Sequence, residues 1–153
     1  MPTILDIQKQ YFGKLDHLDL ELLIAHVLKK TREFVLAHPE HKIRETQNAK
    51  LVSLIKRRIK NEPIAYILGH KEFFGLDFKV TKDTLIPRPD TELLVEEALQ
   101  DLLTAHYSLP TIIDIGTGSG NIIISLAAHY SLPTIHYFAI DISKKARAIA
   151  KQT

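Results

Sequence analysis

Residues 111–120, Thr-Ile-Ile-Asp-Ile-Gly-Thr-Gly-Ser-Gly, decide the fold of this 153-residue chain. An apolar run that breaks into three alternating glycines predicts a buried strand, a sharp turn and the start of a helix. Glycine permits positive φ angles, and its lack of a Cβ lets backbone N–H groups approach a ligand closely. The helix that follows directs its positive end toward the same point. The stretch therefore predicts a cofactor-binding turn.

The spacing of the glycines separates two classes of cofactor. A dinucleotide-binding turn has the pattern Gly-x-Gly-x-x-Gly, and Asn121 stands where its third glycine would be. The Gly-x-Gly-x-Gly spacing instead favours an adenosine-type cofactor that carries no pyrophosphate.

A second β-branched and aromatic run, residues 134–140, ends at Asp141 and leads into a helical segment. Together with the first strand it predicts a βαβ unit. An acid at the tip of this strand, roughly 20 residues after the glycines, is placed to accept hydrogen bonds from a ribose diol. The alternative is that Asp141 only starts the next helix, which Ser143 could also do.

Composition excludes several classes of protein. The chain has no cysteine, which rules out a disulfide framework and a Cys-based zinc site. His38 and His41 are separated by Pro39, so no helix aligns them, and we expect no metal site. No apolar run approaches the roughly 20 residues of a membrane span, and the N-terminus has no signal-peptide pattern. We therefore expect a cytoplasmic protein.

Charge is distributed unevenly between the two halves of the chain. Residues 1–71 hold 13 Lys and Arg against 8 Asp and Glu, whereas residues 72–153 hold 7 against 10. The densest basic run is 56–60, Lys-Arg-Arg-Ile-Lys, on a helical pattern. Such a run is usually a solvated helix face; the alternative is contact with an acidic or RNA-bearing partner.

Hydrophobic periodicity predicts a small helical bundle in the first half of the chain. Apolar residues recur at helical spacing in segments 18–28, 31–36 and 46–59. Asp16 or Asp19 lies near the start of the first of these helices. Residues 64–69 form a short apolar segment, and alternation around Gly75 in residues 73–80 predicts a β-hairpin.

A proline-rich segment separates the hairpin from the next helix. Pro87-Arg88-Pro89 predicts a stiff extended stretch, after which Asp90 or Thr91 caps a helix. That helix is expected to bury one apolar stripe: Leu94, Val95, Ala98, Leu99 and Leu102.

Four blocks of this sequence resemble the release-factor glutamine methyltransferase family of the HemK type. They are residues 61–69, 72–76, 85–95 and 114–120, and the Pro-Arg-Pro-Asp-Thr-Glu block, residues 87–92, is the most specific. The resemblance implies an α/β fold: a helical substrate-recognition domain over 1–70, a β-hairpin linker over 71–86, and the first part of a Rossmann-like class I methyltransferase domain over 87–153.

The resemblance also implies which residues bind S-adenosylmethionine. The methionyl part is surrounded by Gly116, Thr117, Gly118, Ser119 and Gly120, and Asp141 accepts from the ribose. Asp114 either compensates the cofactor's ammonium group or ties down the turn. Beside the cofactor pocket lie Arg88, Thr91 and Glu92, for which linker and helix-capping roles are the alternative.

The activity that the resemblance implies is N5-methylation of the glutamine in the Gly-Gly-Gln motif of peptide chain release factors. An amide nitrogen is a poor nucleophile because its lone pair is delocalised into the carbonyl, so transfer depends on positioning. The family positions it with an Asn-Pro-Pro-Tyr motif, and this chain has no Pro-Pro. We therefore expect an N-terminal part of the enzyme that is inactive alone, contains no catalytic residue, and exposes an edge of the strand 111–115.

The expected partners are release factors, with the ribosome as a second candidate; no membrane and no direct DNA binding is expected. Three other functions stay open: a methyltransferase for a ribosomal-protein glutamine, a non-catalytic adaptor that binds through the basic bundle, and a nucleotide-dependent oxidoreductase. The glycine spacing disfavours the oxidoreductase. The Arg-Pro-Asp-Thr-Glu continuation, residues 88–92, favours a release factor over a ribosomal protein.

Overall fold

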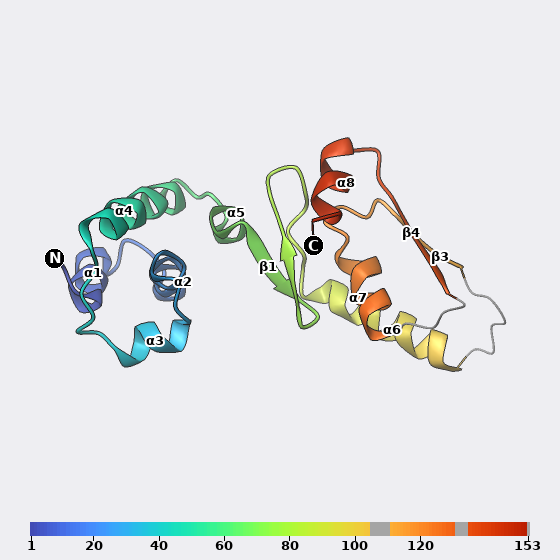
Figure 1. Ribbon diagram of the computed structural model, residues 1–153, viewed down its shortest axis with the longest axis horizontal. Coiled ribbons are helices and arrows are strands. Elements are labelled where there is room, and N and C mark those ends of the chain that lie inside the picture. The colour runs from blue at the N-terminus through green and yellow to red at the C-terminus, as the bar shows by residue number, and fades with distance from the viewer. Residues whose placement is uncertain (105–110, 131–134, 153) are drawn as a thin grey trace. The chain divides into compact units, whose positions relative to one another are not determined.

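The computed structural model describes residues 1–104, 111–130 and 135–152 (Figure 1). The chain divides into two compact units, Met1–Leu68 and Gly69–Thr153. Within the described residues, no helix combines the length and apolar character that crossing a bilayer requires.

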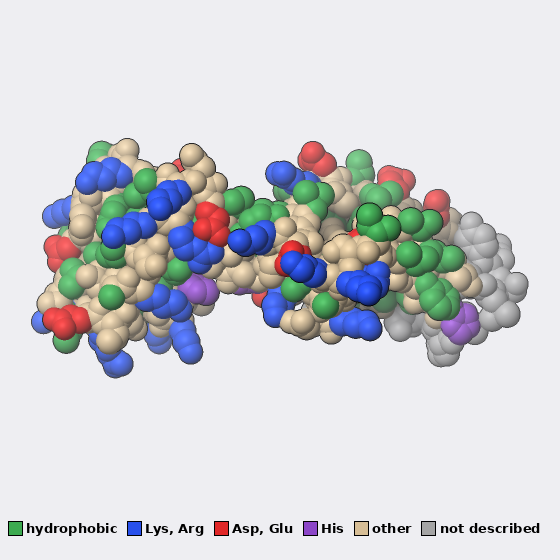
Figure 2. All heavy atoms as spheres, turned by 90° about the horizontal axis from the view of Figure 1, so that it is seen from above, with side chains coloured by type: hydrophobic (Ala, Val, Ile, Leu, Met, Phe, Trp, Pro, Cys, Tyr) green, Lys and Arg blue, Asp and Glu red, His purple; other side chains and the backbone are tan. Residues whose placement is uncertain are grey.

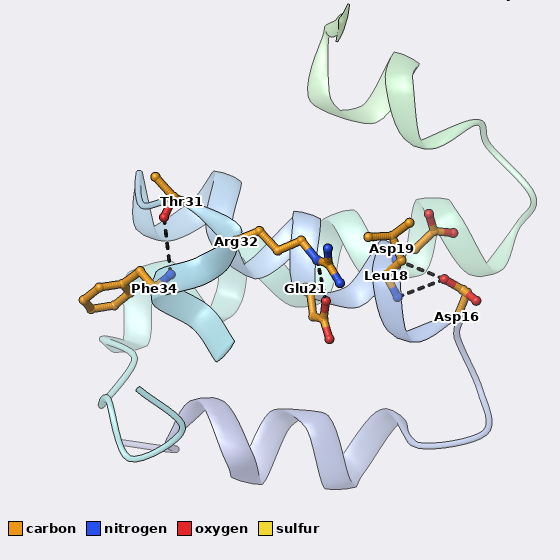
Figure 3. A network of polar contacts seen from close by, with 7 residues as sticks. All are labelled: Asp16, Leu18, Asp19, Glu21, Thr31, Arg32 and Phe34. Carbon is orange, nitrogen blue, oxygen red and sulfur yellow. Dashed lines mark hydrogen bonds and ion pairs between the residues drawn. The ribbon is translucent and has the colours of Figure 1, made fainter. Parts of the chain in front are cut away.

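The first unit is a bundle of helices, as the periodicity predicts. Its helices are α1 (Ile4–Tyr11), α2 (His17–Leu28), α3 (Arg32–Ala37), α4 (Glu45–Ile59) and α5 (Ile64–Leu68). Local capping sets where they begin: the Asp16 carboxylate accepts from the N–H groups of Leu18 and Asp19 at 2.9 and 3.3 Å (Figure 3). In the same way, the Thr31 hydroxyl accepts from the N–H of Phe34 at 3.3 Å (Figure 3).

The core of the first unit is aliphatic. Its most buried side chains, exposed by 1% or less, are Ile4, Ile7, Leu23, Ile24, Val35, Ile43, Leu51 and Ile55. They come from four helices and from the extended segment before α4, so packing joins elements that are distant in the sequence.

The second unit begins with an antiparallel hairpin of β1 (His70–Phe73) and β2 (Leu76–Lys79). Its two-residue turn has φ of 51° at Phe74 and 74° at Gly75, the left-handed pair that a tight hairpin turn requires. Phe73 and Phe78 are buried against Val95 and Leu126. The hairpin therefore packs as part of the second unit.

A βαβ unit follows the long helix α6 (Asp90–Thr104). It consists of β3 (Thr111–Ile115), α7 (Asn121–His129) and β4 (His136–Ile140), and α8 (Lys144–Ala150) comes after it. The two strands are parallel, with Ile113 opposite Phe138 and Ile115 opposite Ile140. This is the arrangement that the glycine turn and the second apolar run predict.

One expectation about α6 is wrong. Val95 is fully buried and Ala98, Leu99 and Leu102 are partly buried, but Leu94 is 55% exposed. The buried positions follow the i, i+3, i+4, i+7 spacing from Val95, so they form one narrow stripe. Leu94 lies about 100° around the helix from Val95 and falls outside that stripe.

One face of the two-stranded parallel sheet is apolar and exposed. Ile112 and Tyr137 pack toward the core that contains Val95 and Leu126. Their neighbours face the other way, and Ile113, Ile115, Phe138 and Ile140 are 53, 81, 53 and 51% exposed. Figure 2 shows hydrophobic side chains gathered over this part of the second unit. Parallel sheets are normally covered on both faces, whereas the described residues cover only one face of this sheet.

Candidate cofactor site

The glycine turn joins β3 to α7 and is fastened to the end of β4. Gly116, Gly118 and Gly120 have φ of 84, 57 and 82°, a region that other residues adopt only with strain. The N–H groups of Gly116 and Thr117 both donate to the Ile140 carbonyl, at 2.7 and 3.0 Å. The carboxyl ends of the two strands therefore meet at the turn, which is where open α/β sheets bind ligands.

The three glycines of the turn have different structural roles. A Cβ at Gly116 or Gly118 would meet no atom within 4 Å, so these positions leave open space above the turn. A Cβ at Gly120 would lie 2.7 Å from Ile124 Cδ1 and 3.2 Å from Ala150 Cβ. The first two glycines keep the backbone accessible, whereas the third allows α7 and α8 to pack closely around it.

Asp141 holds the turn and the start of α8 together. Its Oδ2 accepts from the Gly118 N–H at 2.9 Å, and its Oδ1 accepts from the Ser143 N–H at 2.8 Å. The hydrogen bonds from Ser143 and then Gly118, aided by the charge of Arg147, lower the pKa of Asp141. Ser143 caps α8 by accepting from the Ala146 N–H at 3.2 Å. Each carboxylate oxygen of Asp141 keeps a lone pair for another donor.

Asp114 and Ser119 make contacts inside the turn. The Thr117 hydroxyl donates to Asp114 Oδ2 at 2.7 Å, and Thr117 is only 3% exposed. Ser119 is fully buried, with its hydroxyl 3.3 Å from Asn121 Oδ1. Asp114 thus ties down the turn here, which is one of its two predicted roles.

A cavity of about 190 Å³ lies between the glycine turn and the segment before α6. One wall is Leu85 to Arg88 with Thr91, and the other is Gly116 to Ser119 with Asn121 and Ile122. The structure therefore brings the Pro-Arg-Pro-Asp-Thr segment and the glycine turn to a single cavity, although they are about thirty positions apart in the chain.

Three of the residues predicted to bind the cofactor do not line this cavity: Asp114, Gly120 and Asp141. Glu92 lies outside it as well, because its Oε1 accepts from the Phe74 N–H at 3.0 Å and so fastens the hairpin turn to α6. Five residues that line the cavity are not among the predicted site residues: Leu85, Ile86, Pro87, Asn121 and Ile122. Leu85 and Ile86 could have been identified by their position immediately before the Pro-Arg-Pro segment. Ile122 could have been identified by its position in the first helical turn after the glycines.

The cavity can hold a portion of a ligand that lies against the backbone of the glycine turn. About 190 Å³ is below the roughly 300–1,000 Å³ of sites that enclose a drug-sized ligand, so this space is large enough for only a part of such a ligand. The open space at Gly116 and Gly118 and the positive φ angles provide the close backbone approach that such a ligand needs. Arg88 contributes a cation to the opposite wall.

Comparisons with known proteins agree with the sequence blocks. Residues 13–69 match the model of the PrmC N-terminal domain. Several curated relatives are named "Release factor glutamine methyltransferase". The one from Coxiella burnetii is 46% identical to this chain over 139 residues, which cover 91% of this chain and 49% of that protein. The relative from Haemophilus influenzae is 45% identical over 128 residues, which cover 82% of this chain and 44% of that protein. The relative from Pasteurella multocida is 48% identical over 111 residues, which cover 69% of this chain and 37% of that protein.

These similarities confirm the resemblance to the release factor glutamine methyltransferases. The chain spans about half the length of the curated relatives it matches. The N-terminal match covers most of the helical unit, and the identity with the relatives extends into the second unit that carries the glycine turn.

Proposed function

We propose that this protein is part of an S-adenosylmethionine-dependent methyltransferase that modifies the side-chain amide of a glutamine in peptide chain release factors. The observation that carries the proposal is the cavity lined jointly by residues 85–88, Thr91 and the glycine turn. The names of the relatives also support the proposal, because they describe methyltransferases that act on a glutamine of release factors.

The geometry of the turn supports the following proposed cofactor contacts. When bound, S-adenosylmethionine supplies a methyl group activated by a sulfonium. The backbone of Gly116 to Ser119 packs against the methionyl portion, and Arg88 pairs with its carboxylate. Asp141 accepts from the ribose through its remaining lone pairs while it keeps its bonds to Gly118 and Ser143.

The two remaining predicted residues have supporting roles in this proposal. Asp114 fixes the turn through Thr117 and adds negative charge near the cofactor's ammonium. Thr91 borders the same cavity, and Glu92 acts at a distance by fixing the hairpin turn.

We assign substrate recognition to the helical unit, residues 1–70 in the sequence-based division, with the hairpin segment 71–86 leading to the methyltransferase part at 87–153. The excess of basic residues in the first half suits an acidic or RNA-bearing partner, such as a release factor on the ribosome. This site of action is cytoplasmic.

Methyl transfer itself needs a group that holds the glutamine amide nitrogen in line with the methyl. Delocalisation makes that nitrogen a weak nucleophile, so orientation supplies much of the rate. Among the described residues around the cavity, none is assigned this role. We propose that the chain binds cofactor and substrate but does not transfer the methyl group alone.

A chimera tests the proposed function. Residues 1–153 would replace the matching half of the Coxiella burnetii relative, to which the chain is 46% identical over 139 residues. The chimera should transfer a labelled methyl group from S-adenosylmethionine to a release factor with an intact Gly-Gly-Gln motif. It should not label a variant of that release factor whose motif glutamine is replaced by alanine.

The matched control is Asp141→Ala in the same chimera. It should reduce labelling and weaken cofactor binding by about 1.5–3 kcal/mol, the value of a hydrogen bond to a charged group. A folded chimera that binds the release factor but never methylates it would contradict the proposal, provided the parent relative is active in the same assay.

A further inference from the structure

We propose that the helical unit carries a separate site for phosphate groups, in an open cavity beside α4. The cavity has a volume of about 580 Å³, and its lining includes Lys30, His41, Lys42 and Arg44. There is no Asp or Glu among the described residues that line it. The site lies wholly within residues 1–68 and is independent of the methyltransferase cavity.

Two of the cations are presented by a fixed extended segment. Ile43 is fully buried, its N–H donates to the Pro2 carbonyl at 2.8 Å, and the Ile4 N–H donates to the His41 carbonyl at 3.0 Å. Side chains alternate along an extended backbone, so Lys42 and Arg44 project away from the core that holds Ile43. The backbone therefore fixes the positions from which these two side chains extend before any ligand binds.

Lys30 is also held in position. It follows Lys29, which ends α2 in the left-handed conformation with φ of 53°. The Lys30 N–H donates to the Ala25 carbonyl at 3.0 Å, and its Nζ lies 5.2 Å from the centre of the Phe34 ring. The ring limits where the ammonium group can point without neutralising its charge.

Other arginines of the unit are already paired with carboxylates. Arg32 contacts Glu21 at 2.7 Å (Figure 3), Arg57 contacts Glu62 at 2.5 Å, and Arg58 contacts Asp19 at 2.6 Å. Over the described part of the chain, no ion pair involves Lys30, Lys42 or Arg44. The basic run 56–60 is thus partly neutralised, whereas the cavity keeps its positive charge.

The surroundings do not compensate this charge. Glu40 contacts His38 at 3.3 Å, and Glu45 is exposed and does not line the cavity. Figure 2 shows basic side chains outnumbering acidic ones over the visible face of the first unit. An anion in the cavity would meet several cations at short range and no carboxylate in the wall.

Phosphate is the anion that fits best. A concave space of about 580 Å³ has the size of a small-ligand site, and a polyphosphate places several charges inside such a volume. Arginine binds phosphate through two parallel N–H groups and lysine binds it as a point charge. Carboxylates on a folded partner are spread over a convex surface and would not all enter. The phosphates come either from a free nucleotide or from an RNA backbone.

Calorimetric titrations of the 153-residue chain test this site with three probes: a nucleoside triphosphate, a short single-stranded RNA and a poly-glutamate peptide. The double variant Lys42→Glu/Arg44→Glu should weaken phosphate binding by about tenfold or more, since two charge-assisted contacts become repulsive. The matched control is Lys14→Glu/Lys50→Glu, two exposed lysines outside both the cavity and the basic run 56–60, which makes the same change in net charge. Thermal melting of each variant checks that the helical unit stays folded.

The pattern across the probes decides the outcome. Loss of triphosphate binding in the cavity variant, but not in the control, supports a nucleotide source, and loss of RNA binding alone supports an RNA source. For RNA, the dependence of affinity on salt should become shallower in the cavity variant. Equal loss in both double variants, binding of neither phosphate probe, or equally tight poly-glutamate would overturn the proposal.

Discussion

At the scale of single residues, Asp141 links two structural tasks that the sequence presents as alternatives. It accepts from Gly118 in the turn and from Ser143 at the start of α8, so it both supports the turn and orders the next helix. Ser143 then makes the side-chain cap of α8. The ribose contact stays a prediction, because its partner is the cofactor.

The lowered pKa of Asp141 predicts a pH dependence. Hydrogen bonds from Ser143 and Gly118 favour the charged form in the folded protein, so the stabilising effect is complete above the ordinary aspartate pKa of about 3.9. It is lost as the pH falls through the lower folded value. NMR titration should give the Asp141 carboxyl a pKa below that of an unstructured aspartate. The Gly118 amide should exchange faster once this carboxyl is protonated. A carboxyl that titrates at or above the ordinary value would contradict this account.

The glycines of the turn predict two different mutational effects. Gly118→Ala should cost about 1–2 kcal/mol for the left-handed backbone, since its Cβ would meet no atom within 4 Å. Gly120→Ala should cost about 1–3 kcal/mol more, because its Cβ overlaps Ile124 and Ala150. Urea unfolding of the second unit measures the difference. Equal losses for the two variants would show that the close packing at Gly120 is relaxed in solution.

At the scale of elements, the ion pair between Arg58 on α4 and Asp19 on α2 joins two helices that are 39 positions apart. Asp19 is only 9% exposed, so removing its partner leaves a nearly buried carboxylate. Arg58→Ala should therefore lower the free energy of unfolding of the helical unit by about 1.5–3 kcal/mol. Lys56→Ala, at an exposed position, should change it by less than about 0.5 kcal/mol. Denaturant unfolding of both variants separates them, and similar stabilities would mean that the pair contributes nothing.

This pairing changes how the basic run 56–60 is to be tested for partner binding. Reversing Arg57 and Arg58 would break contacts with Glu62 and Asp19 as well as alter surface charge. A loss of release factor binding in that variant would not separate recognition from folding. Lys56 and Lys60 are exposed and are the better positions for charge reversal.

Elements whose ends depend on local chemistry were predictable from the sequence. Asp16 and Thr31 cap their helices through neighbouring N–H groups, and Gly75 supplies the turn of the hairpin. The helix predicted to open at Thr46 begins one residue earlier, at Glu45, and the Gln47 side chain accepts from the N–H of the N-cap residue Arg44 at 3.1 Å. Leu94 was placed wrongly, since the partner of α6, rather than the apolar character of the residue, decides which stripe is buried.

The candidate site was predictable only in part for a similar reason. Glycine spacing identifies the turn because the signal lies within five residues. The opposite wall, Leu85 to Arg88, comes from an extended proline-rich segment without periodicity, so its packing against the turn is a tertiary fact. Glu92 follows the same motif but contacts the hairpin, which residue identity alone does not reveal.

At the scale of the whole molecule, the two units differ in how well their apolar surface is covered. The helical unit encloses its aliphatic core, whereas the β3–β4 sheet leaves Ile113, Ile115 and Phe138 more than half exposed. A two-stranded sheet with one bare face is weakly stabilised.

Hydrogen exchange should report this difference directly. We expect slow amide exchange in residues 16–60 and much faster exchange in the described strands of 111–152, because fewer buried contacts resist local opening there. Mass spectrometry of the exchanged chain measures both regions in one sample. Uniform protection across the two units in a monomeric sample would contradict the expectation.

The central claim is that the glycine turn and the Pro-Arg-Pro-Asp-Thr segment form one S-adenosylmethionine site. The most direct measurement is an NMR titration of the isotope-labelled 153-residue chain with S-adenosylmethionine. We predict that chemical-shift changes concentrate at the backbone amides of Leu85, Ile86, Arg88 and Thr91 and of residues 116–122. The Asp141 carboxyl should also respond, whereas the helical unit should not. Saturating cofactor that leaves these amides unchanged, or shifts centred elsewhere, would contradict the claim.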